Sequence, residues 1–411
     1  KIFSILNRML LSRLLPLEAM SLYLVIMPTL SLCLTLGQVG IPSAVFRLIL
    51  HPNYKNYKVI ITAILLSFFS VIVICGTLFI VSPFIAHSLL KNEYTLYPIL
   101  SFLIFIPLIA ISGIIKNYYL AKGHVYVIAK SQIVEETSRL LFTYLFLKNP
   151  LSSSLPFLVT IAYLSMSFGE LMSIIYLLLL SRKKYSFAPL KNINKQNLIM
   201  KDLLNISLPL TGSRLYHCFI NFLEPILLIH VLTQLGLTQN YIQDQYAILS
   251  GYVVSLLVTP TFFCTIIYRL YLPIATDDLY YHKSTAFLHL LYALLIGLPF
   301  TLIFYFFPKQ SLMVLYNTTS GYQQLKYMAF PFLLFYLQTP LSTILQAKNK
   351  NKVMFIISII ECTLEIILTY TLSHYLYVNA ILISLFTGLI TTLTLSAIYC
   401  FKIIIKDTSL S

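Results

Sequence analysis

Long apolar runs separated by short polar connections make up almost the whole chain. Most runs reach the roughly 20 residues that an α-helix needs to cross the hydrocarbon core of a bilayer, which is about 30 Å thick. The pattern therefore predicts an all-α polytopic membrane protein with about twelve transmembrane helices. We expect these helices at about residues 2–15, 19–48, 59–89, 95–121, 125–147, 155–181, 203–235, 245–274, 285–308, 323–347, 353–375 and 379–405.

The first two runs depart from a simple span. The stretch 2–15 contains Arg8 and Arg13, and about 14 residues at a rise of 1.5 Å per residue cannot cross the core. We therefore expect the first helix to be truncated and to begin upstream of this sequence. The second run is long, and we expect it to break near Gly40 and Pro42.

Composition strengthens this prediction. Hydrophobic residues make up 58% of the 411 residues, charged residues make up 10%, and the mean hydropathy is +0.85, which leaves no room for a large soluble domain. The chain lacks a glycine-rich phosphate loop, a His-Glu-x-x-His motif and a nucleophile elbow. We therefore expect a protein that is not an enzyme and has no cofactor or metal. We interpret its net charge of +15 as a topology signal, not as a nucleic-acid interface.

The longest polar connection divides the predicted helices into two sets. It contains six basic residues, namely Arg182, Lys183, Lys184, Lys191, Lys195 and Lys201. We expect an N-terminal six-helix bundle over residues 1–181, with its first helix partial, and a C-terminal six-helix bundle over residues 203–411. The basic connection between them, residues 182–202, is expected to be cytoplasmic.

Basic residues alternate between rich and poor connections, as the positive-inside rule requires of a correct helix count. One side holds 18 of the 28 Lys and Arg residues. The other side holds five, namely Arg13, Lys91, Lys148, Lys309 and Lys326. The rich side is expected to face the cytoplasm, together with both ends of the full-length chain.

An internal repeat supports the division. Residues 121–144 align without gaps with residues 347–370, at a shift of 226, and eight of the 24 positions are identical. The identities include Lys122 with Lys348, and Glu135 with Glu361, which apolar composition alone would not align. The shift places the fifth helix on the eleventh, so the two halves run through the membrane in the same direction. Parallel repeats of this kind are known in transporters, where the substrate site lies between the halves.

Several ionisable residues fall within predicted spans, where each is costly unless it faces a cavity or a partner. They are Glu135, Glu136, Glu170, Glu224, Glu361, Glu365, Arg139 and Arg214. Glu135 and Arg139 are one helical turn apart and could neutralise each other. A polar stripe follows the helix at 203–235, at spacings of three, four and three residues: Arg214, His217, Asn221 and Glu224. These side chains could bridge helices, but the set favours a polar, water-accessible cavity between the two bundles.

Four segments resemble the stage V sporulation protein B group of polysaccharide-biosynthesis membrane proteins, within the multidrug/oligosaccharidyl-lipid/polysaccharide (MOP) exporter superfamily. They are residues 11–50, 118–141, 213–228 and 249–276. The patterns Ser-Arg-x9-Glu-Pro, from Ser213, and Gln-x2-Glu-x3-Arg, from Gln132, are the most specific. The chain departs from the group at Pro16, where Gly is usual, and in stopping after about twelve helices where members often have fourteen.

The resemblance implies a MATE-like fold of two pseudo-symmetric bundles that alternates between inward-open and outward-open states. It further implies transport of an isoprenoid pyrophosphate-linked saccharide across the bacterial cell membrane. Because a pyrophosphate head needs cationic partners in a low dielectric, the candidate substrate-binding residues are Arg214 first, then Arg8, Arg13, Arg47, Arg139 and Asn221. Acids expected to balance these charges, or to couple transport to a proton or cation, are Glu135, Glu224, Glu361 and Glu365. The expected partners are the lipid-linked saccharide, membrane lipids and the coupling ion, with the protein a monomer.

Two other functions fit the same features. A cation-coupled multidrug antiporter of the same fold would use its intramembrane acids to hold a cationic drug. A membrane scaffold of cell-wall or spore assembly would transport nothing, and it would tolerate neutralisation of both Arg214 and Glu361.

Overall fold

Helices are the only regular elements in the described part of the chain. The computed structural model describes residues 2–51, 54–181, 194–265, 283–348 and 350–408. Contacts between Cα atoms divide the chain into two compact units, Lys1–Phe222 and Leu223–Ser411. The two units are described separately below. The predicted all-α fold is therefore confirmed, whereas the predicted domain boundaries at 181 and 203 stay predictions.

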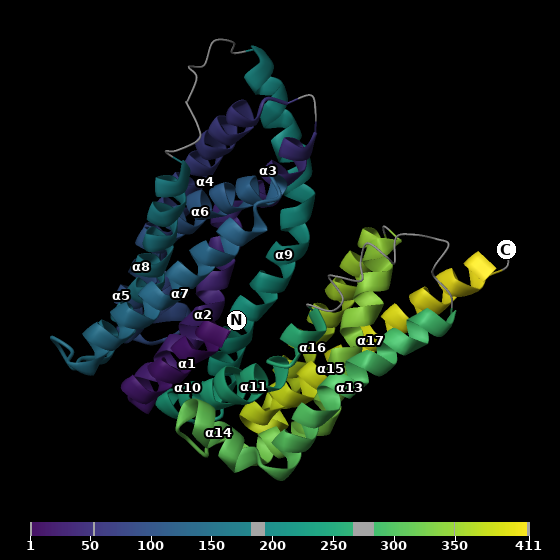
Figure 1. Cartoon of the computed structure of the whole chain (residues 1–411). Coiled ribbons are helices and arrows are strands. Elements are labelled where there is room, and N and C mark those ends of the chain that lie inside the picture. The colour runs from purple at the N-terminus through teal and green to yellow at the C-terminus, as the bar shows by residue number, and fades with distance from the viewer. Residues whose placement is uncertain (1, 52–53, 182–193, 266–282, 349, 409–411) are drawn as a thin grey trace. The chain divides into compact units, whose positions relative to one another are not determined.

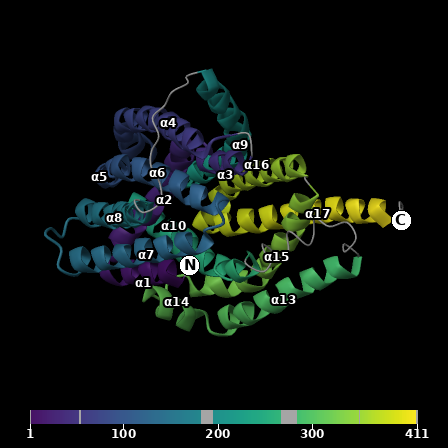
Figure 2. The ribbon, with the colours of Figure 1, turned by 45° about the horizontal axis from the view of Figure 1, so that its top comes forward.

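The N-terminal unit is a bundle of long helices joined by short turns. Its elements are α1 (Ile2–Leu14), α2 (Leu17–Gln38), α3 (Ile41–Leu50), α4 (Asn56–Phe84), η1 (Ile85–Leu89), η2 (Glu93–Thr95), α5 (Leu96–Leu100), α6 (Phe102–Ala121), α7 (Val125–Lys148), α8 (Leu155–Ser181) and the first part of α9 (Asn194–Gln234). Figure 1 shows α6, α7 and α8 side by side, and Figure 2 shows α1 along α7. The break predicted near Gly40 is present between α2 and α3.

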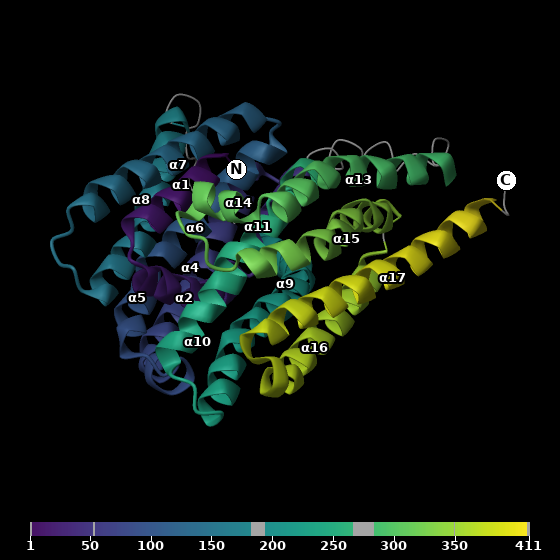
Figure 3. The same ribbon diagram turned by 90° about the horizontal axis from the view of Figure 1, so that it is seen from below.

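The C-terminal unit begins within α9 and continues through α10 (Gln239–Tyr246), the π-helix η3 (Ala247–Val254) and α11 (Ser255–Val258). After an interval outside the described residues come α13 (Lys283–Phe306), α14 (Pro308–Tyr316), α15 (Tyr322–Ala347), α16 (Asn351–Leu376), η5 (Tyr377–Asn379) and α17 (Ala380–Thr408). In Figure 3, α16 and α17 lie side by side. Helices α13 and α14 meet at an angle of 97°.

Within the residues that the structure describes, seven helical stretches are long and apolar enough to cross a membrane, or eight if the bent pair α13 and α14 counts as one span. One stretch of 51 residues, Lys352–Lys402, contains both α16 and α17 and so accounts for two of the predicted spans. The other predicted helices are α1, which has only 13 residues, α7, which carries several charges, and the α10–α11 region. The helices thus follow the predicted series of about twelve.

The helix ends obey the same shift of 226 residues as the sequence repeat. Helix α7 begins at Val125 and α16 at Asn351, while α6 ends at Ala121 and α15 at Ala347. Helix α8 covers Leu155–Ser181, and α17 covers the equivalent positions within one residue at each end. Each unit therefore carries one copy of a common helix plan.

A hydrogen bond ties the start of α9 to the α3–α4 connection. The hydroxyl of Tyr54 donates to Oδ2 of Asp202 at 2.5 Å. This bond to a carboxylate, helped by burial and by the negative charge, raises the pKa of the Tyr54 hydroxyl. The nearby core includes Val45, Ile199 and Leu203, so the second part of the predicted polar connection, from Asn194, is packed helix rather than loop.

Gly297 on α13 lies directly against the ring of Tyr336 on α15. A Cβ at position 297 would overlap the Cδ2 atom of that ring. Tyr336 is fully buried, and its hydroxyl donates to the carbonyl of Leu257 at 2.8 Å, so the ring cannot move without losing this bond. We expect Gly297→Ala to lower the free energy of unfolding of the C-terminal unit by roughly 1–3 kcal/mol, measured by tyrosine fluorescence during unfolding in detergent.

The matched control for this substitution is Gly76→Ala on α4. A Cβ at Gly76 meets nothing within 4 Å, so this variant should be neutral or slightly more stable, as expected for alanine in a helix. Equal stability of the Gly297→Ala and Gly76→Ala proteins would contradict the close packing of α13 on α15.

Candidate functional site

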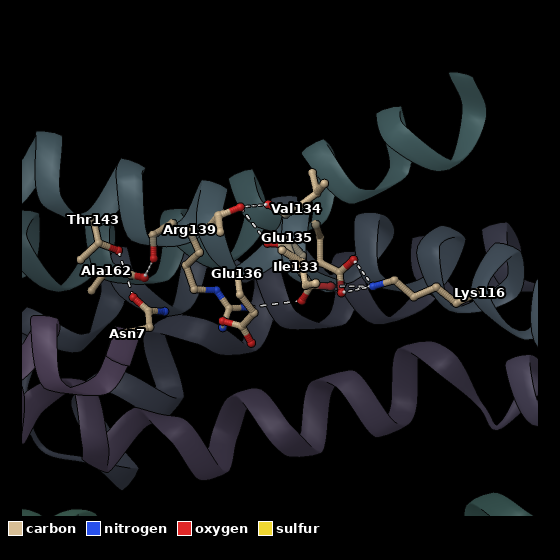
Figure 4. Close-up of polar contacts among 12 residues, drawn as sticks. Asn7, Lys116, Ile133, Val134, Glu135, Glu136, Arg139, Thr143 and Ala162 are labelled. Carbon is tan, nitrogen blue, oxygen red and sulfur yellow. Dashed lines mark hydrogen bonds and ion pairs between the residues drawn. The ribbon is translucent and has the colours of Figure 1, made fainter. Parts of the chain in front are cut away.

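Three helices of the N-terminal unit meet at the ammonium group of Lys116. On α6, its Nζ lies 2.7 Å from Oε2 of Glu135 on α7 and 3.1 Å from Oε2 of Glu170 on α8. The side chains of Lys116, Glu135 and Glu170 are 16%, 13% and 6% exposed. Figure 4 shows Lys116 reaching toward Glu135. One cation therefore joins α6, α7 and α8 in a region largely shielded from water.

Arg139 extends this network along α7. Its Nη2 lies 3.6 Å from Oε1 of Glu135, and its Nη1 lies 3.4 Å from Oε2 of Glu136 (Figure 4). The predicted pairing of Glu135 with Arg139 is therefore confirmed. One turn further, the hydroxyl of Thr143 donates to Oδ1 of Asn7 on α1 at 3.5 Å. Polar contacts thus link four helices of this unit.

Close approach of α8 to α7 shields the network. A Cβ at Gly169 would lie 2.8 Å from the carbonyl oxygen of Glu135 and 3.3 Å from Cβ of Arg139, so a larger residue would push the helices apart. Within this low-dielectric region each ion pair is strengthened, and removal of one partner is costly. We infer that the network braces the unit, with the charge of Arg139 shared by two carboxylates while its Nε is buried without a hydrogen-bond partner.

Two members of the network, Lys116 and Glu170, are missing from the residues expected at the site. The structure places Lys116 within α6, where its side chain binds two carboxylates between helices. A lysine this close to the end of a span commonly extends toward the membrane interface, so hydropathy does not predict a buried Lys116. The sequence feature that could have indicated the network is Glu170, an acid within a span that has no basic residue nearby on the same helix.

The predicted polar stripe lies on α9, which is uninterrupted over these positions. Nδ2 of Asn221 lies 3.3 Å from Nε2 of His217, and the side chain of Arg214 is exposed. These three residues belong to the N-terminal unit, whereas Glu224, at the end of the stripe, belongs to the C-terminal unit.

Three acids of the C-terminal unit lie within its helices. Glu224 on α9 and Glu365 on α16 are close enough for their charges to interact, and Glu361 lies one turn before Glu365 on α16. Oε1 of Glu224 is buried without a hydrogen-bond partner. Where side chains are described, none of the three acids forms an ion pair with Lys or Arg. Such an arrangement is suited to taking up a proton or a monovalent cation, because unpaired negative charge in a membrane interior is costly.

The remaining candidate arginines are Arg8, Arg13 and Arg47, all exposed in the N-terminal unit. Among the described residues, no ion pair involves Arg8, Arg47 or Arg214. These guanidinium groups therefore differ from Arg139, which is already bound to carboxylates.

The fold resembles that of solved membrane transporters. An inward-facing multidrug resistance MATE family transporter of the MOP superfamily matches with a TM-score of 0.72 at 14% identity, covering 100% of this chain and 95% of that one. The MATE multidrug transporter DinF-BH matches with a TM-score of 0.68 at 13% identity, covering 98% of this chain and 91% of that one. At such identities the likeness shows the fold alone. The chain is a multi-pass membrane protein with a MATE-like fold.

Sequence comparison narrows this class. The model of the polysaccharide biosynthesis protein family matches residues 1–277, and the chain belongs to this family. Stage V sporulation protein B of Bacillus subtilis (strain 168) is 28% identical over 362 residues, which are 84% of this chain and 69% of that protein. Sporulation protein YkvU of the same strain is 25% identical over 259 residues, 62% of this chain and 57% of that protein. The chain thus spans little more than half the length of the second relative. The family and the fold expected from the sequence are confirmed.

Proposed function

We propose that this protein moves a lipid-linked saccharide across the bacterial cell membrane by alternating access. The observation that carries the proposal is membership of a polysaccharide biosynthesis family together with a MATE-like fold. A saccharide on an isoprenoid carrier can keep its tail in lipid while its polar head crosses through protein. Both relatives are named as sporulation proteins, which together with the polysaccharide biosynthesis family supports a precursor of a spore or cell-wall polysaccharide as the substrate.

The exposed arginines are the proposed contacts for the pyrophosphate of this head. Charge-assisted hydrogen bonds from guanidinium to phosphate are strong and directional. Arg214 ranks first because it is exposed and is the first residue of the polar stripe on α9. The further candidates are Arg8, Arg13, Arg47 and Asn221. Arg139 ranks last, because its charge is engaged by Glu135 and Glu136.

The acids of the C-terminal unit are the proposed coupling site. Glu224, Glu361 and Glu365 have no cationic partner among the described side chains, so binding of a proton or cation would relieve their repulsion. Glu135, in contrast, balances Lys116 and Arg139. The sequence has no ATP-binding loop, so we propose that an ion gradient or membrane potential drives transport.

A reconstituted flipping assay tests this function. Purified protein in liposomes should move an isoprenoid pyrophosphate-linked saccharide from one leaflet to the other, and an imposed proton or sodium gradient should change the rate. Transport of cationic drugs with no movement of the lipid-linked saccharide would favour the multidrug antiporter. Normal complementation by a protein with both Arg214→Ala and Glu361→Gln, without flipping activity, would favour the scaffold.

A further inference from the structure

Two lysines and two tyrosines form cation–π contacts where α13, α14 and α15 meet. Nζ of Lys326 on α15 lies 5.2 Å from the centroid of the Tyr305 ring on α13. Nζ of Lys309 on α14 lies 4.5 Å from the centroid of the Tyr322 ring on α15. Tyr322 and Lys326 are one turn apart on α15, so the four side chains lie together. We name them the lysine-tyrosine cluster.

The lysine-tyrosine cluster carries two positive charges with no acidic residue near them in the sequence. The sequence contains no Asp or Glu between residues 279 and 360, a range that includes all of α13, α14 and α15. Lys309 and Lys326 are both exposed, and neither forms an ion pair with a described residue. They are also two of only five basic residues on the side predicted to be extracytoplasmic. A cationic cluster there runs against the distribution of charge in the rest of the chain.

The lysine-tyrosine cluster lies beside the break between α13 and α14, which bend by 97°. Helix α14 has nine residues, too few to cross a hydrocarbon core that needs about 20, so a position along the membrane surface fits it. Helix α14 buries Leu312 and exposes Met313 and Val314, and Phe306 and Phe307 are also exposed. An apolar face with lysines beside it is the pattern of a helix at the level of lipid headgroups.

The common helix plan does not require these four residues. At the shift of 226 residues, the N-terminal unit has Phe79, Pro83, Leu96 and Leu100 at the equivalent positions. None of these four residues is charged, so none could supply the cation of a cation–π contact. The cluster is therefore a property of the C-terminal unit alone, which favours a role in binding over a role in folding.

We propose that the lysine-tyrosine cluster binds the phosphate of an anionic phospholipid, such as phosphatidylglycerol, in the outer leaflet. The two ammonium groups supply charge complementarity, and the tyrosine rings hold them in place by cation–π contact. The exposed apolar side chains of α13 and α14 contact the acyl chains. The proposal depends on the membrane topology and not on the transported substrate.

Native mass spectrometry of the full chain in detergent tests this binding. The protein is mixed separately with phosphatidylglycerol, phosphatidylethanolamine and a polyprenyl phosphate. The unmodified protein should retain phosphatidylglycerol in preference to phosphatidylethanolamine. The double variant Lys309→Gln/Lys326→Gln should bind phosphatidylglycerol roughly 30-fold more weakly, because each lysine near a membrane surface contributes about 1 kcal/mol.

Lys148→Gln is the matched control. Lys148 lies on the same predicted side, 4.9 Å from the ring centroid of Tyr144, but as a single pair, so this variant should keep normal binding. The variant Lys309→Arg/Lys326→Arg should also bind, which separates loss of charge from loss of fold. Unchanged binding in the double Gln variant, an equal loss in Lys148→Gln, or retention of polyprenyl phosphate but not phosphatidylglycerol would overturn the proposal.

Discussion

Replacing Lys116 by methionine is expected to lower the free energy of unfolding of the N-terminal unit by roughly 3–5 kcal/mol. Methionine is apolar and of similar length, so the substitution removes the charge with little change in volume. Glu135 and Glu170, which are 13% and 6% exposed, would then face each other without the ammonium between them. The chain has 30 Tyr and no Trp, so tyrosine fluorescence during unfolding in detergent provides the measurement.

Two further variants make this test specific to the network. Lys116→Met combined with Glu170→Gln should recover much of the lost stability, because one buried negative charge is removed along with the positive one. Lys130→Met changes an exposed lysine that stacks on Tyr126 of the same helix, α7, and should cost about 0.5 kcal/mol or less. If Lys116→Met proved as stable as Lys130→Met, the bracing role of the network would be refuted.

Arg214→Ala is expected to slow flipping of the lipid-linked saccharide by roughly 100-fold or more. Loss of one partner from a desolvated, hydrogen-bonded charge pair costs about 2–5 kcal/mol, and we propose that the pyrophosphate is the other partner. Initial rates in liposomes with matched protein content give the measurement. Arg214 has no carboxylate partner among the described residues, so its removal should leave the thermal stability almost unchanged.

The control for this variant lies on the same helix. Lys201→Ala removes an exposed cation from α9 and should flip substrate at the normal rate. Arg214→Lys should retain part of the activity, because lysine keeps the charge but loses the two-pronged geometry of guanidinium. Normal flipping by a stable Arg214→Ala protein would remove this residue from the mechanism without excluding the flippase function.

Most of the fold follows from hydropathy, because a membrane allows few alternatives to an apolar helix. The run predicted at 155–181 is α8 residue for residue, and the break near Gly40 separates α2 from α3. Hydropathy does not encode the direction of the backbone, so the bend of 97° before α14 and the π-helix η3 were not predicted. The start of α9 at Asn194 was also missed, because its first turns are polar.

The candidate site was harder to predict, because it depends on contacts between helices. A spacing of four residues revealed the pair of Glu135 and Arg139, since that contact lies within one helix. Lys116 and Glu170 belong to two other helices, and only the packing of α6 and α8 against α7 brings them to Glu135. Sequence can show that a buried charge needs a partner but cannot say which neighbouring helix provides it.

The shared helix plan has an electrical consequence. At equivalent positions the N-terminal unit has Arg139 on α7 and the C-terminal unit has Glu365 on α16. The two units therefore carry opposite charges at this position. The acids of the first half are already paired with Lys116 and Arg139, so this half should respond little to a changing proton gradient. The acids of the second half have no cationic side chain to pair with among the described residues, so a proton or cation from solution must neutralise them. We therefore expect the first half to stay rigid and the second half to respond to the ion gradient.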